Sequence, residues 1–501
     1  MNKFLLTLWI IIISGGIFIS YKLTKPESAN KENLAEIKTQ QQPEKQDVQK
    51  AKENNADTST KSDTPTKSYA SYILQGDEDL KNNNLASAIG NYSSATDLKP
   101  DSTDAFLKLG KVYLSLNDPQ KAKSAFQKVE KLSPQLIEAN LGIAESYLNL
   151  RDIESAKTII WKMDKSNPNV KYYTGIILIL HKDFAGAKKL FTEISEDASQ
   201  TQTSGIKENS QVFLEAYKLF SYFKEGEQIF LETLLAKSLT EIGQFESSIP
   251  LLYDVINQKN NYRDAWTILG YAYLNTNKIQ DAIDAFSQAE SLYPEKPQTL
   301  FFLGLAHYAN NDIDKAIHYL EKAKEYGFEP KEEIELKLGD IYLLKKDYSK
   351  SAEQYEKVVS LNLANVDIFV RTAWIYIEKL KDPEKALAVA YKSLEKYPSD
   401  SMSYNLMGWS LIAKGEFEKS KDYLNKAIQM KPNFDAAYLN FGWLMEKQGQ
   451  VDMAKEYYKN AYTLGAGNAI SLLATKRLED ITNKELKTYK FQTDISSLKT
   501  P

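Results

Sequence analysis

Residues able to perform acid–base, metal or nucleophilic chemistry are sparse and badly spaced in this sequence. Neither the three histidines nor any other group shows a metal-binding spacing such as HExxH, and there is no cysteine for zinc binding, disulfides or thiol catalysis. Carboxylate pairs such as Glu332 and Glu333 are typical of the first turn of a helix, where the helix dipole favours negative charge. The sequence therefore predicts no enzyme activity, no metal site and no cofactor. The histidines are His181, His307 and His318.

Binding chemistry is better represented, because three tryptophans recur at a nearly constant interval. Trp374, Trp409 and Trp443 each follow a small residue directly, and Tyr271 stands after Gly270 in the same way. Tryptophan offers a large apolar contact and one N–H donor, and it is enriched at interaction hot spots. What these side chains can contact depends on the elements that carry them.

Those elements belong to a motif that returns about every 34 residues. Within each copy the apolar positions are three or four residues apart, which places them on one face of a helix and predicts two helices per copy. We expect Gly270 and Ala282 to let the two helices approach closely, with Tyr273 and Phe286 filling the space beside them. A larger side chain at either small position would overpack the pair. The clearest copy has Trp266, Leu269, Gly270, Tyr273, Ala282, Phe286, Ala289 and Pro294.

This pattern resembles the tetratricopeptide repeat over residues 69 to 468. The resemblance implies an all-α, right-handed superhelical solenoid of helix-turn-helix repeats. In such a solenoid each copy buries its apolar face on its neighbours. The expected copies begin at Tyr69, Thr103, Ile137, Pro168, Ile229, Arg263, Pro297, Glu332, Val366, Ser401 and Asp435.

Two features interrupt the array and one ends it. Residues 195–210 are polar without an apolar period, so we expect a loop there and a degenerate helical unit at 212–223. This divides the array into a block at 69–194, a break at 195–228 and a block at 229–468. The copy from Val366 has one extra residue, expected in the loop at 381–383. Residues 469–501 are expected to form a capping helix and a polar tail.

The resemblance also implies where a partner binds. In this family the position after the small residue faces the inner, concave surface, so the aromatic residues would form a ladder along a groove suited to an extended or helical peptide. Packing against the first helices of neighbouring copies is the alternative for the same side chains, and the sequence leaves both open. The predicted groove residues are Trp374, Trp409, Trp443, Tyr271, Phe301, Tyr308, Arg371, Asn405, Leu439 and Asn440.

The N-terminus differs from the rest of the chain. Residues 4–21 form an apolar run long enough to cross a membrane, and we favour an uncleaved single-pass anchor at 1–21 over a signal peptide because the run continues past the small residues Ser14 and Gly16. Residues 22–68 are polar, balanced in charge and predicted to be a disordered linker. The lysines that follow the run would keep the array in the cytoplasm by the positive-inside rule. The very short basic tail before the run resembles a secretory signal instead, and on this ground we favour an array that faces outward, into the periplasm or extracellular space.

Charge restricts the class of partner. The net charge is −4 and only four arginines occur among 63 basic residues, which argues against nucleic acid. Some family members clamp a C-terminal carboxylate, but Arg371, Asn405 and Asn440 lack the lysines that such a clamp needs. We therefore expect a membrane-anchored scaffold that binds protein or peptide partners and localises a complex at the cell envelope. The alternatives are a glycan-binding receptor and a regulatory subunit of a separate enzyme; the oligomeric state is open.

Overall fold

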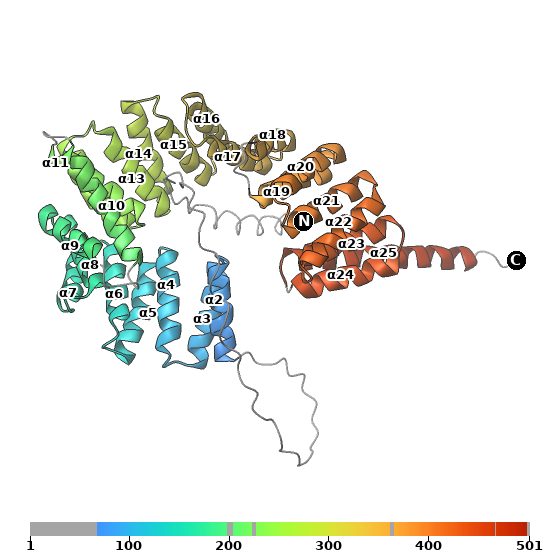
Figure 1. Ribbon diagram of the computed structural model, residues 1–501, viewed down its shortest axis with the longest axis horizontal. Helices are drawn as coiled ribbons and strands as arrows, with labels where there is room; N and C mark the ends of the chain where they lie inside the picture. The colour runs from blue at the N-terminus through green and yellow to red at the C-terminus, as the bar shows by residue number, and fades with distance from the viewer. Residues whose placement is uncertain (1–67, 198–203, 223–226, 361–364, 466, 498–501) are drawn as a thin grey trace, which may run out of the picture. The chain divides into compact units, whose positions relative to one another are not determined.

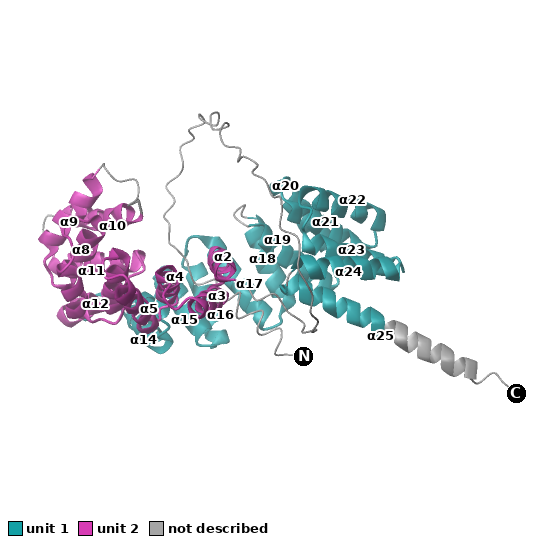
Figure 2. Ribbon diagram, turned by 90° about the horizontal axis from the view of Figure 1, so that it is seen from below, with its two compact units in different colours: residues 1–8, 259–501 teal, residues 9–258 magenta. Residues whose placement is uncertain are grey.

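The computed structural model describes residues 68–197, 204–222, 227–360, 365–465 and 467–497, with side chains up to residue 483 in the last helix. The described residues are helical and contain no strand (Figure 1). They fall into two compact units (Figure 2). Among the described residues, the N-terminal unit comprises those up to 258 and the C-terminal unit comprises those from 259 onward. The predicted anchor at 1–21, and the predicted linker except Ser68, lie outside the described residues.

The helices of the N-terminal unit are α2 (Tyr69–Lys81), α3 (Leu85–Leu98), α4 (Thr103–Ser115), α5 (Pro119–Leu132), α6 (Ile137–Asn149), α7 (Ile153–Trp161), α8 (Pro168–Leu180), α9 (Phe184–Glu196), α10 (Ser204–Ser221), α11 (Gln228–Glu241) and α12 (Phe245–Gln258). Those of the C-terminal unit are α13 (Arg263–Asn275), α14 (Ile279–Leu292), α15 (Pro297–Ala309), α16 (Ile313–Glu325), α17 (Lys331–Leu344), α18 (Tyr348–Ser360), α19 (Val366–Trp374), the π-helix η1 (Ile375–Leu380), α20 (Pro383–Lys396), α21 (Ser401–Lys414), α22 (Phe417–Met430), α23 (Asp435–Lys447), α24 (Val451–Gly465) and α25 (Ala469–Ser497).

The helix pairs confirm the predicted copies. First helices begin at the predicted residue, except α11 and α17, which begin one residue earlier. The copy from Ile137 is short because its second helix, α7, ends after nine residues. Within the part of the chain that the structure describes, no helix is both long and apolar enough to cross a membrane.

Small residues set the distance between the two helices of a copy. A Cβ placed on Gly270 would lie 2.7 Å from the ring of Phe286, and one on Gly339 would lie 2.6 Å from the ring of Tyr355. Such separations are too short for a real side chain, which supports the overpacking predicted for a larger residue at Gly270 and extends it to Gly339. In the copy from Val366, Ala373 replaces the glycine and Ala390 stands where the aromatic residue is expected.

The turn between paired helices is built around one residue of left-handed backbone conformation. It is the fifteenth residue of a copy, for example Asn117 with φ of 55°, Lys346 with φ of 61° and Gly415 with φ of 89°. Glycine adopts this conformation without steric cost, and asparagine tolerates it better than lysine does. The next residue commonly caps the second helix, as Asp118 does by accepting from the backbone N–H of Lys121 at 3.2 Å.

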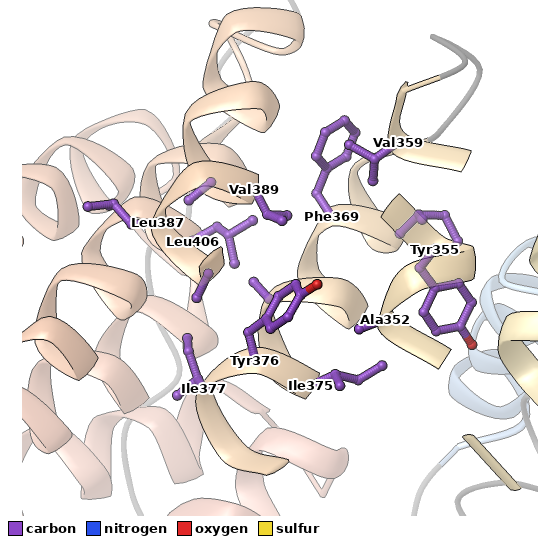
Figure 3. Packing of buried hydrophobic residues seen from close by; sticks show 14 of the residues in the cluster. Ala352, Tyr355, Val359, Phe369, Ile375, Tyr376, Ile377, Leu387, Val389 and Leu406 are labelled. Carbon is purple, nitrogen blue, oxygen red and sulfur yellow. The ribbon is translucent and has the colours of Figure 1, made fainter. Parts of the chain in front are cut away.

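The extra residue of the copy from Val366 does not lie in the loop, so that prediction is wrong. It lies in the first helix, which changes from α-helix to the π-helix η1 directly after Trp374. The turn residue, Lys381 with φ of 56°, is therefore the sixteenth of its copy, and the turn itself is unchanged. Figure 3 shows Ile375, Tyr376 and Ile377 of η1 in the same buried cluster as Tyr355 and Leu406. This packing stabilises the wider helical turn of η1.

The break in the periodicity contains a single unpaired helix. The loop predicted at 195–210 is shorter than expected, because α9 continues to Glu196 and α10 begins at Ser204. In α10, Phe213 stacks on Phe191 with ring centroids 4.4 Å apart, and the Tyr217 hydroxyl donates to the carbonyl of Phe184 at 2.8 Å. The helix thus continues the core of the N-terminal unit.

The α11–α12 pair also belongs to the N-terminal unit. Helix α12 packs against α6, about a hundred residues earlier in the chain, and against α8, about eighty residues earlier. Arg151 pairs with Glu246 at 2.6 Å, Lys182 pairs with Asp254 at 3.0 Å, and the Gln244 side-chain amide donates to Glu145 at 3.3 Å. The unit therefore ends at Gln258, thirty residues beyond the break in the sequence pattern.

The last helix covers the end of the C-terminal unit, as a capping helix should. Ala474 and Ile481 of α25 are buried against α23 and α24. By contrast, Leu472 and Leu473 are about half exposed. The helix continues to Ser497, through most of the stretch expected to be a polar tail.

Candidate partner-binding face

Three successive first helices present a tryptophan at the same position. Trp374 ends α19, Trp409 lies in α21 and Trp443 lies in α23, and we call these three residues the tryptophan row. Each side chain is half-buried and packs against the buried cluster that includes Phe369, Tyr376 and Leu406. Part of every ring is therefore packing, and part faces solvent.

The indole N–H groups distinguish the row from a tryptophan used only for packing. A tryptophan within a core usually finds a hydrogen-bond acceptor, and the Trp266 indole N–H does so by donating to the carbonyl of Asn260 at 2.8 Å. Within the described residues the three row tryptophans have no such acceptor, and none of their indole nitrogens is buried without a partner. Each therefore offers a solvent-facing donor.

Arg371 is engaged by its own chain. Its guanidinium donates to Asp340 Oδ1 at 2.6 Å and lies 3.3 Å from the hydroxyl of Tyr355, which itself donates to the same carboxylate oxygen at 2.6 Å. Burial and then the charge of Asp340 raise the pKa of Tyr355 far above its ordinary value, so its hydroxyl stays a donor. These bonds link the copy that contains Asp340 and Tyr355 to the next copy, which contains Arg371. The guanidinium is therefore used within the chain.

Three further predicted residues are buried, so the expectation that they present their side chains to a partner is wrong. Phe301 is 1% exposed and stacks on Phe328 with centroids 4.1 Å apart. Asn405 and Asn440 are 4% and 8% exposed, and the Asn440 amide donates to Asn405 Oδ1 at 2.9 Å. A buried amide needs such a partner. The pair joins α21 to α23.

The remaining predicted residues are half-buried and lie at the surface. Tyr271 packs its ring 5.1 Å from that of Phe302, and Leu439 packs against the buried cluster of α23 and α24. Burial, with a smaller contribution from the charge of Asp340, raises the pKa of Tyr308 to about 12. The structure thus brings the row, Tyr308 and Leu439 to the surface as partly exposed apolar groups of the C-terminal unit.

His307 and His181 contact side chains of their own chain. His307 is buried, stacks on Tyr319 at 5.3 Å and lies 3.2 Å from Asp312, while His181 lies 3.3 Å from Glu154. In the described ranges no group of three or more histidine, aspartate or glutamate side chains is placed to hold a metal ion.

Two neighbours of the row were missed by reasoning from sequence. Asp340 stands directly after Gly339, the position the tryptophans occupy in later copies, and this shared position was a readable signal. Lys379 lies with its ammonium 4.9 Å from the Trp374 ring centroid and 5.5 Å from that of Tyr348. The sequence pattern did not predict that Lys379 would lie over Trp374, because this contact depends on the π-helix η1.

Comparison with known families places repeats in both units. Family models described as "Tetratricopeptide repeat" match residues 104–135, 267–330, 336–365, 367–400, 403–434 and 435–464, and one described as "TPR repeat" matches residues 76–117. A 158-residue stretch is 27% identical to a TPR repeat-containing protein of Methanocaldococcus jannaschii, covering 31% of this chain and only 27% of that relative.

Several solved structures are similar to this chain at low identity. They include the APC/C hetero-tetramer Cut9–Hcn1 (13% identity, 83% of this chain and 96% of that chain, TM-score 0.30) and yeast Tom70 (15%, 86% and 99%, TM-score 0.28). Naa15/Naa10 bound to HypK-THB is a third (12%, 86% and 89%, TM-score 0.36). With TM-scores below 0.5, these likenesses carry no inference about overall shape or function.

Proposed function

We propose that this chain, which carries tetratricopeptide repeats in both units, is a scaffold that binds protein or peptide partners along the tryptophan row. The single observation that carries the proposal is the unpaired, solvent-facing indole N–H of Trp374, Trp409 and Trp443. Stacking of copies does not require tryptophan there, since other copies have Tyr271 or Asp340 at the same position. A large apolar ring with an available donor is what binding hot spots commonly offer.

The proposal extends to where the scaffold acts. Residues 4–21 would anchor the chain in a membrane, with residues 22–68 as a tether and the array facing outward. The apolar run at 4–21 supports this, and its length is that of a membrane span. The complex assembled on the row would then form at the cell envelope.

Affinity capture from detergent-solubilised membranes tests the binding role. We expect Trp409→Ala and Trp443→Ala to weaken capture of the specific partners at least tenfold, the size of a hot-spot truncation, with helicity and melting temperature nearly unchanged. Trp161→Ala is the matched control, because Trp161 is an exposed tryptophan on α7, outside the row.

Two outcomes contradict the proposal. If both row variants unfold, the row is part of the core. If they fold and capture is unchanged, the partner binds elsewhere. Titrating tryptophan fluorescence with glycan fragments and with peptide pools tells a sugar-binding row from a peptide-binding one, because aromatic faces suit both ligands.

A further inference from the structure

The π-helix η1 places a positive charge on the tryptophan row. In an α-helix, a residue five positions along points about 140° away from the first. A π-helix bonds residue i to i+5, so the two lie nearly above each other. This is how Lys379, five residues after Trp374, holds its ammonium 4.9 Å from the Trp374 ring. The extra residue of this copy therefore has a consequence at the surface.

A second ammonium lies at the other end of the row. Lys447 follows Trp443 by one helical turn, and its ammonium is 5.6 Å from that ring. Both lysines are exposed, and neither has a carboxylate partner in the part of the chain that the structure describes. No described ammonium lies over Trp409, between them. The row thus has a lysine at each end and, at its centre, a half-buried indole with no described ammonium over it.

Nearby carboxylates are occupied by groups of the same chain. Asp340 is held by Arg371 and Tyr355. Glu446 accepts from the Tyr458 hydroxyl at 2.8 Å and lies 3.9 Å from the guanidinium of Arg477, and Glu378 has Lys381 at 3.8 Å. The charge left without a partner at the row is therefore positive at both ends. A complementary ligand is negative at both ends and apolar in the middle.

We propose that the row selects an acidic peptide in which a large apolar side chain is flanked on both sides by carboxylates. The apolar side chain packs on Trp409, and the carboxylates pair with Lys379 and Lys447. This inference rests on the proposed binding function. Neighbouring first helices lie about 10 Å apart, so the two lysines are about 20 Å apart, the length of about six extended residues.

Fluorescence anisotropy with the full chain tests the charge preference. The probes are labelled 12-residue peptides with one central phenylalanine in a glycine–serine background, flanked by glutamates, glutamines or lysines at varied spacing. A single-stranded oligonucleotide of equal charge is the fourth probe. We expect the glutamate probe to bind about tenfold more tightly than the glutamine probe at low salt, with the best spacing near six residues and the difference lost at high salt.

The lysine variants locate the effect. Lys379→Gln and Lys447→Gln should each weaken the glutamate probe two- to fivefold, as expected for an exposed ion pair, and leave the glutamine probe unchanged. Lys381→Gln is the matched control, because Lys381 is also exposed and lies two residues away but already has Glu378 as its carboxylate partner. Circular dichroism confirms that the variants fold.

The outcomes separate this inference from the proposed function. Equal affinity for glutamate and glutamine probes, preference for the lysine probe or oligonucleotide, or no binding by any peptide overturns the acidic-peptide inference. Partner capture that still depends on Trp409 would then leave the proposed function standing. If Trp409→Ala does not affect capture, the proposed function itself fails, whatever the charge preference.

Discussion

The same substitution, glycine to alanine, should have opposite effects at two helical positions. At Gly339 the new Cβ would lie 2.6 and 2.7 Å from ring atoms of the buried Tyr355, whereas at the exposed Gly90 no atom lies within 4 Å. Alanine is the better helix former by about 1 kcal/mol. At Gly339, overpacking costs about 1–3 kcal/mol. A displaced ring also weakens the Tyr355–Asp340 hydrogen bond, by about 1 kcal/mol.

We therefore expect Gly339→Ala to destabilise α17 and α18 by about 2 kcal/mol and Gly90→Ala to stabilise α2 and α3 by about 0.5–1 kcal/mol. Amide hydrogen exchange is the suitable assay, because an array of repeats need not unfold in two states. Amides of α17–α18 should exchange about 30-fold faster, and those of α2–α3 two- to fivefold slower, at 1.4 kcal/mol per tenfold. Equal effects at both sites, or unchanged exchange in α17–α18, would refute the proposed steric role of the ring.

Three further predictions concern the turns, the link between copies and Glu145, a half-buried acid of the N-terminal unit. Lys346→Gly should raise the melting temperature, by relieving about 1 kcal/mol of left-handed strain, and Gly415→Ala should lower it. Asp340→Ala should speed exchange in α17–α20 about tenfold or more, because it leaves the buried Tyr355 hydroxyl without an acceptor and the Arg371 guanidinium without its carboxylate. Burial raises the pKa of Glu145, so the folded state binds this proton more tightly and the N-terminal unit loses stability as pH rises above the usual carboxyl range. Urea unfolding of Glu145→Gln across that range should show a weaker dependence on pH.

Most of the repeat architecture was predictable because it depends on local spacing. Glycine beside an aromatic residue, and a proline after the second helix, recur at fixed offsets. Each copy contacts mainly its neighbours, so a pattern within 34 residues determines most contacts. The site was predictable to the extent that it follows this pattern, as the position of the three tryptophans does.

The remaining features depend on contacts that a local pattern does not encode. The extra residue at the copy from Val366 could be absorbed in a loop or in a helix, and burial of Ile375 and Tyr376 determines the choice. The packing of α12 on α6 joins segments about a hundred residues apart. Burial of Phe301 depends equally on a distant ring, that of Phe328.

The acid–tyrosine–cation arrangement at Asp340 recurs elsewhere in the chain, and this bears on cooperativity. In the N-terminal unit the Tyr92 hydroxyl donates to Asp77 at 2.7 Å, and Lys108 of the next copy pairs with the same carboxylate oxygen at 2.8 Å. In a linear array the nearest-neighbour coupling energy decides whether adjacent repeats melt together or one by one. These junctions carry a polar coupling term, as does the Asn405–Asn440 pair between α21 and α23, so the copies on either side of each should unfold as a single cooperative block.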